Sequence, residues 1–384
     1  MALLRIFTVS GSAAAPTVVW SLQSNSGDIP GWTGYTSLLY DPVSRRVLSY
    51  LIPNTSTSIY STDLFAYDSA SGAWTRLGGT QSPSNLCNNG SAATSANGSP
   101  LSPWPPDRHP VQQMAIDTQR NRLWLFSGVC QGNIEDDLWF YALNANPTAN
   151  RWTKVTLSTV PSMVSGGLIY SPDDDVLVLS GPQAVSSAHE TWVYCPSSTL
   201  SARQSAAGCS GPNTWTKIGS TQPTSGLASL PNTRYDTVRH KLVQFHAGAR
   251  EVWEYDIPSQ TWTNRHPSGL PTETDQCCPE QAVAYLKTGS LAGKFIYHQT
   301  SHTPGRAFAK DYLYDPAANA FTALDSTGGG PQKLVYLTWD AGRNAIVAWS
   351  YVDGVASDVW QGVVEGDVPR PPVPATPTSL HVIK

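Results

Sequence analysis

Short segments in which apolar and polar residues alternate recur along the chain, and they follow one four-part order. The first segment ends in Asp, as in SLLYD and QQMAID, and a polar turn leads to a second segment such as RVLSY, RLWLFSG or DVLVLSG. A third segment carries two aromatic residues two positions apart, and a fourth carries an aromatic residue before Thr. Alternation with a period of two is typical of β-strands, so each repeat predicts a small sheet of four strands.

The third strand gives the most regular column of the repeat. Residues two apart on a strand lie on the same face, so both rings can pack against a neighbouring sheet. The pairs are Phe65 and Tyr67, Trp139 and Tyr141, Trp192 and Tyr194, Trp253 and Tyr255, and Tyr312 and Tyr314; the sixth copy has Trp360 with Gly362.

An acidic residue precedes most of these third strands. Because it recurs with the repeat, we expect it to bond the backbone inside each unit rather than to build a functional ring of carboxylates. The column consists of Asp63, Asp137, Glu190, Glu251 and Asp358, with Lys310 as the exception.

The fourth strand is missing from the last repeat and is found at the other end of the chain. Its aromatic residues are Trp74, Trp152, Trp215, Trp262 and Phe321, and no further copy follows Trp360. The segment VVWSLQ, with Trp20, supplies the missing copy. An unpaired outer strand leaves an exposed sheet edge, so we expect the N-terminal strand to close the ring as the outer strand of the last unit. The sequence therefore predicts an all-β, six-bladed propeller over residues 16–366.

The order of strands and turns resembles the kelch family of β-propellers, most clearly from Asp117 to Val155, DTQRNRLWLFSGVCQGNIEDDLWFYALNANPTANRWTKV. The resemblance implies a six-bladed kelch-type β-propeller. The Gly-Gly pair that the family places after the second strand is kept only in part, as Ser127-Gly128 and Ser180-Gly181. His246 and His298 occupy the corresponding places in the fourth and fifth blades.

The ends of the chain differ in composition from the repeats. Residues 1–15 are interpreted either as the remnant of a signal peptide or as a disordered start. Residues 367–384 form a Pro-rich tail or linker, and their PATPTSLHVI resembles the opening strand of a fibronectin type III module.

Composition restricts the cellular compartment and the classes of partner that we expect. Only 14% of the residues are charged, and the six cysteines form no C-x-x-C zinc pattern, which favours an oxidising compartment: secreted, periplasmic or at the cell surface. A net charge of −4 argues against nucleic acid as a partner. No apolar run is long enough to insert into a membrane, and we expect a monomer.

Cysteine spacing suggests a disulfide framework without fixing it. Proximity in sequence favours Cys195 with Cys209, closing one loop, and Cys87 with Cys130, tying a long linker to the second blade. The adjacent Cys277 and Cys278 then remain. They can form a vicinal disulfide, bridge to two other loops, or bind a metal as thiolates.

The kelch resemblance also implies where a ligand would bind. It places the connections between blades, and those between second and third strands, on one face around the central channel, here named the upper face. Channel mouths with convergent polar groups are the usual ligand sites of such folds. The candidates for ligand binding on this face are Tyr35, Trp104, Arg108, His109, His246, Arg250, Cys277, Cys278, His298, His302 and Arg306.

Within this set Arg108 is interpreted first as an anchor that bonds carbonyls of its own long loop, and second as a cation beside a general base, His109. His246, His298 and His302 are the candidate metal ligands among the histidines, and their spacing does not select a metal. No cofactor is predicted; copper, zinc and calcium remain open.

Two functions remain compatible with these residues. The sequence has no G-x-S-x-G, H-E-x-x-H, Gly-rich phosphate loop or EF-hand loop. It therefore favours a non-catalytic module that binds a glycan or a protein. The alternative is a carbohydrate-active propeller enzyme, either a polysaccharide lyase using His, Tyr and Arg or a copper oxidase similar to galactose oxidase. No motif identifies the copper ligands of that family in this chain.

Overall fold

The computed structural model of the chain describes residues 16–31, 36–51, 63–77, 105, 108–110, 112–130, 133–143, 152–163, 166–182, 188–219, 223, 232–246, 250–271, 282–299, 310–331, 334–351 and 358–365. The predictions made for residues 1–15 and 367–384, and for Cys87, Cys277 and Cys278, lie outside these ranges.

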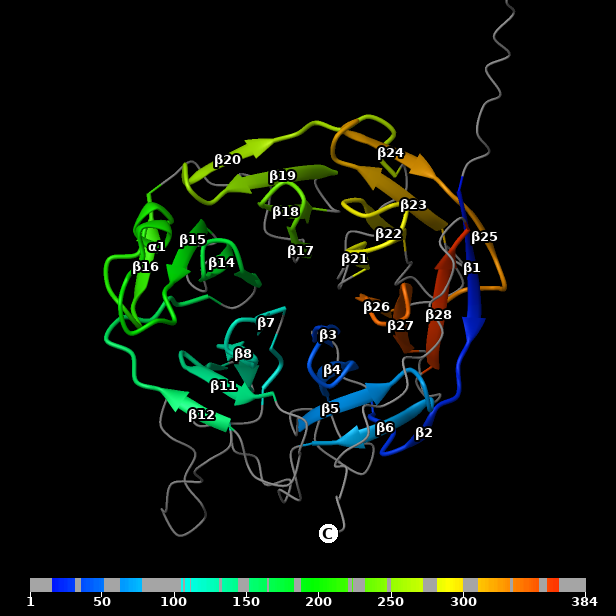
Figure 1. Cartoon of the computed structure of the whole chain (residues 1–384), viewed down its shortest axis with the longest axis horizontal. Helices are drawn as coiled ribbons and strands as arrows, with labels where there is room; N and C mark the ends of the chain where they lie inside the picture. Colours follow the sequence, from blue (N-terminus) through cyan, green and yellow to red (C-terminus); the bar gives the residue numbers. More distant parts are fainter. Residues whose placement is uncertain are drawn as a thin grey trace, which may run out of the picture.

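Six small antiparallel sheets surround a central axis as the blades of a propeller (Figure 1). Blade one consists of β3 (Leu39–Asp41), β4 (Arg46–Leu51), β5 (Asp63–Asp68) and β6 (Ala73–Arg76). Blade two consists of β7 (Met114–Asp117), β8 (Arg122–Phe126), β11 (Leu138–Ala142) and β12 (Trp152–Val155). Blade three consists of β13 (Gly167–Ser171), β14 (Val176–Pro182), β15 (His189–Tyr194) and β16 (Trp215–Ile218).

The other half of the ring repeats the same order. Blade four consists of β17 (Asn232–Asp236), β18 (Lys241–His246), β19 (Glu251–Asp256) and β20 (Thr261–Asn264). Blade five consists of β21 (Val283–Tyr285), β22 (Phe295–Gln299), β23 (Lys310–Asp315) and β24 (Ala320–Ala323). Blade six consists of β26 (Leu334–Asp340), β27 (Ala345–Tyr351), β28 (Asp358–Val364) and β1 (Thr17–Leu22).

The N-terminal strand closes the ring as the sequence predicts. Strand β1 pairs antiparallel with β28, with Trp20 opposite Gly362 and Leu22 opposite Trp360, and Figure 1 shows β1 and β28 side by side in one blade. The all-β, six-bladed prediction is thus confirmed. The core is divided into six apolar clusters, one between each pair of neighbouring blades.

The aromatic columns pair in one register in blades one to five. Five ring pairs, each joining the second aromatic of the third strand to that of the fourth, have centroids 4.7 to 5.3 Å apart. They are Tyr67–Trp74, Tyr141–Trp152, Tyr194–Trp215, Tyr255–Trp262 and Tyr314–Phe321. In blade six, Gly362 stands in the place of the tyrosine. A Cβ there would lie 2.8 Å from the ring of Trp20, so the glycine makes room for the closing indole.

The first-to-second strand hairpins of blades one, two, four and six share one Asp-centred turn. Asp41 Oδ1 accepts a hydrogen bond from the Val43 N–H (2.9 Å), and Asp117 Oδ1 accepts one from the Gln119 N–H (3.0 Å). Side-chain acceptors of this kind fix the turn two residues ahead. The last turn residue takes a left-handed conformation in several of these hairpins: Arg45, Asn121, Asp175, His240 and Asn344.

Two connections between blades add an unexpected parallel strand to the outer edge of the blade that they lead into. Strand β2 (Ser26–Gly27) pairs with β6, and β25 (Asp325–Thr327) pairs with β1. A single parallel bridge, Ser268 with Ala320, repeats this at blade five. The added segments cover outer strands whose backbone groups would otherwise face solvent.

The acidic column binds side chains more than backbone, which corrects the expectation from sequence. Asp137, Glu190 and Glu251 each accept a hydrogen bond from the indole of the Trp two residues later (2.7, 2.8 and 2.8 Å). A cation on the fourth strand pairs with the carboxylate in three blades: Arg76 with Asp63, Lys154 with Asp137 and Lys217 with Glu190. A backbone bond is present at Asp63, which accepts from the Leu64 N–H (2.8 Å).

One of the predicted disulfides lies within the described residues. Cys195 and Cys209 are bonded, with Cα atoms 6.1 Å apart, and they enclose helix α1 (Ala202–Ala206) between β15 and β16. Cys130 lies in β9 (Val129–Cys130), which forms a hairpin with β10 (Asn133–Ile134) between the second and third strands of blade two. Its predicted partner, Cys87, is outside the described residues. Over the described ranges, no helix has the length and apolarity needed to cross a membrane.

Candidate functional site

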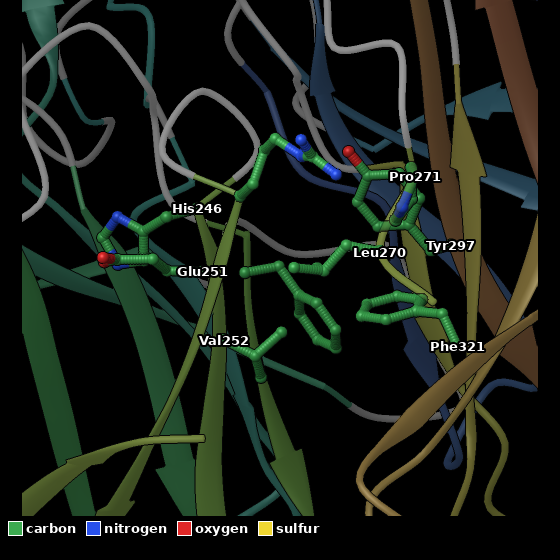
Figure 2. A pocket seen from close by; sticks show the side chains of 9 residues that line it. His246, Glu251, Val252, Leu270, Pro271, Tyr297 and Phe321 are labelled. Atoms are coloured by element: carbon green, nitrogen blue, oxygen red, sulfur yellow. The ribbon is translucent and has the colours of Figure 1, made fainter. Parts of the chain in front are cut away.

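A pocket of about 260 Å³ opens on the upper face between blades four and five. Its walls come from the end of β18, the start of β19, the connection between the blades, and strands β22 and β24. Figure 2 shows His246 and Glu251 on one side, Tyr297 and Phe321 on the other, and Leu270 between them. The lining residues are Phe245, His246, Arg250, Glu251, Val252, Leu270, Pro271, Tyr297 and Phe321.

The floor of this pocket is aromatic and rigid. Phe245 packs edge-on against Phe295 at 5.3 Å and also contacts the rings of Tyr297 and Phe321, each at 6.3 Å between centroids. Tyr297 is only 7% exposed. Burial raises the pKa of its phenol, and the nearby Tyr312 adds to the effect, so the hydroxyl stays protonated and available as a donor.

Arg250 is the solvent-exposed cation of the pocket. It precedes β19 and has a positive φ of 55°, which is uncommon for a residue other than Gly, Asn or Asp. Among the described residues, none accepts a hydrogen bond from its guanidinium or forms an ion pair with it. The backbone thus holds at the rim of an aromatic pocket a positive charge that has no ion-pair partner among the described residues.

His246 is a neutral, buried wall of the pocket. Its Nε2 lies 2.7 Å from Gln244 Oε1, and its ring centroid lies 5.7 Å from that of His189 in the neighbouring blade. Burial first, and then the proximity of His189, lower the pKa of His246 to about 3. At neutral pH, His246 therefore contributes a hydrogen-bonding surface without charge.

Glu251 supplies the negative charge of the pocket. It is half-buried and directly opposite His246 in the β18–β19 pairing. The indole of Trp253 donates to Glu251 Oε2 (2.8 Å), which fixes the carboxylate at the rim. The pocket therefore combines the Glu251 carboxylate, the exposed Arg250 guanidinium and an aromatic floor.

Arg108 is placed away from this pocket and acts as an anchor. It is fully buried, pairs with Asp137 and donates to the Ser127 carbonyl (3.0 Å). These two partners belong to blade two itself. Although burial disfavours its charge, Asp137 more than compensates and raises the pKa of Arg108.

His109 and His298 also lie outside the pocket lining. His109 forms a backbone bridge with Val129. His298 is 1% exposed; its Nδ1 lies 2.8 Å from Asp311 Oδ1 and its Nε2 lies 3.2 Å from the Pro331 carbonyl. Of the predicted ligand residues, the structure thus brings together His246 and Arg250. Tyr35, Trp104, Cys277, Cys278, His302 and Arg306 lie outside the described residues, as does the metal ligand set built on His302.

Within the described part of the chain, no group of three or more His, Cys, Asp or Glu side chains is arranged to hold a metal ion. His298, one of the three candidate ligands, uses both ring nitrogens on protein oxygens. The described residues therefore do not fit a copper centre.

Sequence reasoning missed His189, Glu251 as a pocket residue, and Tyr297. His189 begins β15 and faces His246 across the blade boundary. The sequence did contain a signal for Tyr297, because this residue directly precedes His298 in the same second strand. What the sequence did not show is which of these adjacent side chains faces the gap between blades.

No family model matches the sequence, and no curated protein matches it. Among solved structures, a fungal alcohol oxidase of the AA5 family, in complex with copper, shares 11% identity with a TM-score of 0.54, covering 92% of this chain and 79% of the oxidase. A protein of unknown function from Bacteroides thetaiotaomicron VPI-5482 shares 10% identity (TM-score 0.46; 91% and 76% covered). A chain of a nidogen/laminin complex shares 11% (TM-score 0.42; 75% and 79% covered). The similarity to the oxidase shows the propeller fold and no more.

Proposed function

We propose that this chain is a secreted, kelch-type propeller that binds a glycan or protein ligand at the upper-face pocket between blades four and five. The observation that carries the proposal is Arg250, an exposed arginine held in a left-handed conformation over an aromatic pocket, with no partner among the described residues. Backbone strain of this kind is found at ligand sites because the surrounding structure must compensate for it.

The chemistry of the pocket suits a sugar that carries an acid group. Aromatic floors provide apolar contact for the C–H faces of a ring, and Tyr297 and Glu251 offer a donor and an acceptor for hydroxyls. A guanidinium binds a carboxylate or sulfate through paired, charge-assisted hydrogen bonds. An acidic polysaccharide is therefore the glycan that the described residues favour.

Three features support the kelch type, and one supports the extracellular setting. The four-strand repeat, the turn chemistry and the N-terminal closing strand follow the pattern that led to the kelch resemblance. The Cys195–Cys209 disulfide is consistent with an oxidising, extracellular location.

A binding screen with matched arginine variants tests the proposal. Immobilised polysaccharides with and without uronate or sulfate groups are probed with the wild-type chain, Arg250→Asn and Arg45→Asn. Asparagine tolerates the left-handed conformation, and Arg45 is an exposed arginine with a φ of 58° in a hairpin turn at the opposite end of the blades. We expect acidic glycans to be retained by the wild type and Arg45→Asn and lost by Arg250→Asn. Equal binding by all three proteins would contradict the proposal.

The carbohydrate-active enzyme is tested on the same preparations. Bound copper, or the release of unsaturated uronates from an acidic polysaccharide, would establish the enzyme instead of the binding module. If the wild-type chain instead retains a protein in this screen and Arg250→Asn does not retain it, the pocket would be assigned to a protein ligand.

A further inference from the structure

The upper-face pocket has a polar side toward blade four and an apolar side toward blade five. Figure 2 shows His246 and Glu251 on the polar side. Leu270, Pro271 and Phe321 line the opposite side, and we call these three side chains the apolar wall. A sugar hydroxyl placed against this wall would lose its hydrogen bonds to water without a replacement, which costs free energy. The part of a glycan that enters this side should therefore carry an apolar group.

Backbone hydrogen bonds hold the apolar wall in place. The Ser268 N–H donates to the Asn319 carbonyl (3.2 Å), and the Phe321 N–H donates to the Ser268 carbonyl (2.9 Å). These two bonds fasten the connection between blades four and five to the outer strand β24. Leu270 follows two residues later and packs against the apolar cluster that these two blades share. Because the wall is formed in advance, a ligand does not have to order it on binding.

The Tyr297 hydroxyl places one hydrogen-bonding group beside the apolar wall. The Tyr297 ring lies edge-on to that of Phe321, with centroids 6.1 Å apart. In the described ranges no residue donates a hydrogen bond to this hydroxyl or accepts one from it. Burial raises the pKa of the phenol, so the oxygen keeps its proton at neutral pH. The apolar side of the pocket therefore contains a donor that a ligand oxygen can use.

We propose that the apolar side of the pocket binds an acetyl substituent of the acidic glycan, with its methyl group on Leu270 and Phe321 and its carbonyl oxygen bonded to the Tyr297 hydroxyl. This acetyl site rests on the proposed function, because it lies in the same pocket. An acetyl group carries a methyl group and an acceptor oxygen on one carbon, which matches an apolar wall with an adjacent donor. The methyl group of a deoxysugar would leave the Tyr297 hydroxyl without a partner, and an unsatisfied buried donor is costly.

The acid group and the acetyl group are bound by different parts of the pocket. Arg250 at the rim provides the positive charge for the acid, whereas the apolar wall and Tyr297 carry no charge at neutral pH. The pocket volume of about 260 Å³ is below the range of roughly 300–1,000 Å³ that is usual for drug-sized ligands. One sugar unit with its substituent therefore enters the pocket, and the rest of the polymer stays outside. The two groups can thus be tested separately.

The test measures the affinity of the full chain for two matched pairs of immobilised acidic polysaccharides. One pair is O-acetylated alginate and the same material after mild alkaline deacetylation; the other is heparosan, which is N-acetylated, and its N-formyl derivative, which lacks only the methyl group. The variants are Tyr297→Phe, which removes the hydroxyl and keeps the ring, and Leu270→Asn, which makes the wall polar at similar size. The matched control is Tyr312→Phe, on the neighbouring strand β23, because Tyr312 is not among the residues lining the pocket.

We expect the wild type and Tyr312→Phe to bind the acetylated member of at least one pair roughly tenfold more tightly than its partner, as for one well-packed methyl group. The pair that shows this preference identifies the substituent as O-acetyl or N-acetyl. Leu270→Asn should abolish the preference, and Tyr297→Phe should weaken binding of the acetylated polymer about fivefold, as for one neutral hydrogen bond.

The acetyl site is overturned if Leu270→Asn keeps the preference, or if Tyr297→Phe binds the acetylated polymers as tightly as Tyr312→Phe does. Equal binding of both members of each pair, still lost in Arg250→Asn, overturns the acetyl site and leaves the proposed function standing. Failure of the wild type to bind any of the four polymers overturns both.

Discussion

The indole Nε1 of Trp20 donates a hydrogen bond to Asp311 Oδ2 at 2.8 Å, across 291 residues of sequence. Trp20 belongs to the strand that closes blade six, and Asp311 belongs to β23 in blade five. Asp311 also accepts from Ser326 (2.5 Å) and lies against His298. Burial alone would raise the pKa of Asp311, but His298, Ser326 and Trp20 together lower it, so the carboxylate is ionised and anchors the closure.

We predict that Trp20→Phe lowers the free energy of unfolding by about 1.5–3 kcal/mol, the usual contribution of a hydrogen bond to a charged group. Denaturation in urea, followed by tryptophan fluorescence and circular dichroism, measures the change. Trp360→Phe on the neighbouring strand is the control, because the Trp360 indole nitrogen is buried without a partner among the described residues. A loss of equal size in both variants would show that ring volume, not the bond to Asp311, matters.

The closure of the ring by the N-terminal strand could be predicted from sequence because it follows from the number of fourth-strand aromatic residues. Five fourth-strand aromatics and one near the N-terminus make a complete column, and the structure places all six on outer strands in the same register. The edge strands β2 and β25 could not be predicted, because two or three residues in a parallel pairing show no alternation. Their signal is different: Ser26-Gly27, Ser268-Gly269 and Thr327-Gly328 each place a glycine with positive φ against an outer strand.

We predict that Gly328→Ala destabilises the protein more than Gly329→Ala, by about 1–3 kcal/mol. Both substitutions place alanine in a left-handed conformation, but only the first also creates a steric overlap with a neighbouring strand. Both glycines have positive φ, 82° and 87°. A Cβ on Gly328 would overlap the Trp20 carbonyl oxygen, whereas one on Gly329 would only touch the Trp360 ring at 4.0 Å. Thermal unfolding of the two variants measures the difference. Equal melting temperatures would show that β25 moves away from β1 to accommodate the added Cβ without a loss of stability.

We predict that the double variant Cys195→Ala, Cys209→Ala loses roughly 3 kcal/mol of stability under non-reducing conditions, since the bond closes a loop of about fifteen residues. Reductant should lower the stability of the wild type to a similar degree and leave the variant unchanged. Recovery of free thiols at both positions from the native protein, by peptide mapping without reductant, would refute the bond and weaken the extracellular setting.

The residues of the candidate site could be predicted only in part from the sequence. His246 stands where the repeat has a turn glycine, which made it recognisable as a replacement, and Arg250 was a candidate because it lies in the adjoining connection on the upper face. His298 occupies the equivalent place in blade five, yet it is buried against Asp311 and Pro331, a partnership formed only by the fold. Arg108 likewise has a carboxylate partner in Asp137, which directly precedes β11 and is 29 residues away in sequence. Sequence identifies the unusual residue, whereas the neighbouring blade decides whether it faces solvent or the core.

We predict that two buried histidines make the fold sensitive to acid below pH 6.5. Burial lowers the pKa of His189 to about 4, and burial with the nearby His189 lowers that of His246 to about 3, against about 6.5 in an unfolded chain. Between pH 6.5 and about 4 the unfolded chain binds two protons that the folded chain does not. The free energy of unfolding should therefore decrease as the pH is lowered, by about 1 kcal/mol per pH unit for each histidine.

Carboxyl groups act in the opposite direction in part of this range, so the prediction concerns differences between variants. Burial raises the pKa of Glu135 to about 7, and that group favours the folded chain as the pH falls toward 4.5. We expect His189→Gln and His246→Gln each to be less sensitive to acid than the wild type when urea midpoints are compared at pH 7.5, 6, 5 and 4.5. His266→Gln, at an exposed position, is the control and should keep the wild-type dependence. If both buried variants keep it as well, these histidines are not buried in neutral form, and the uncharged pocket wall assigned to His246 has to be abandoned.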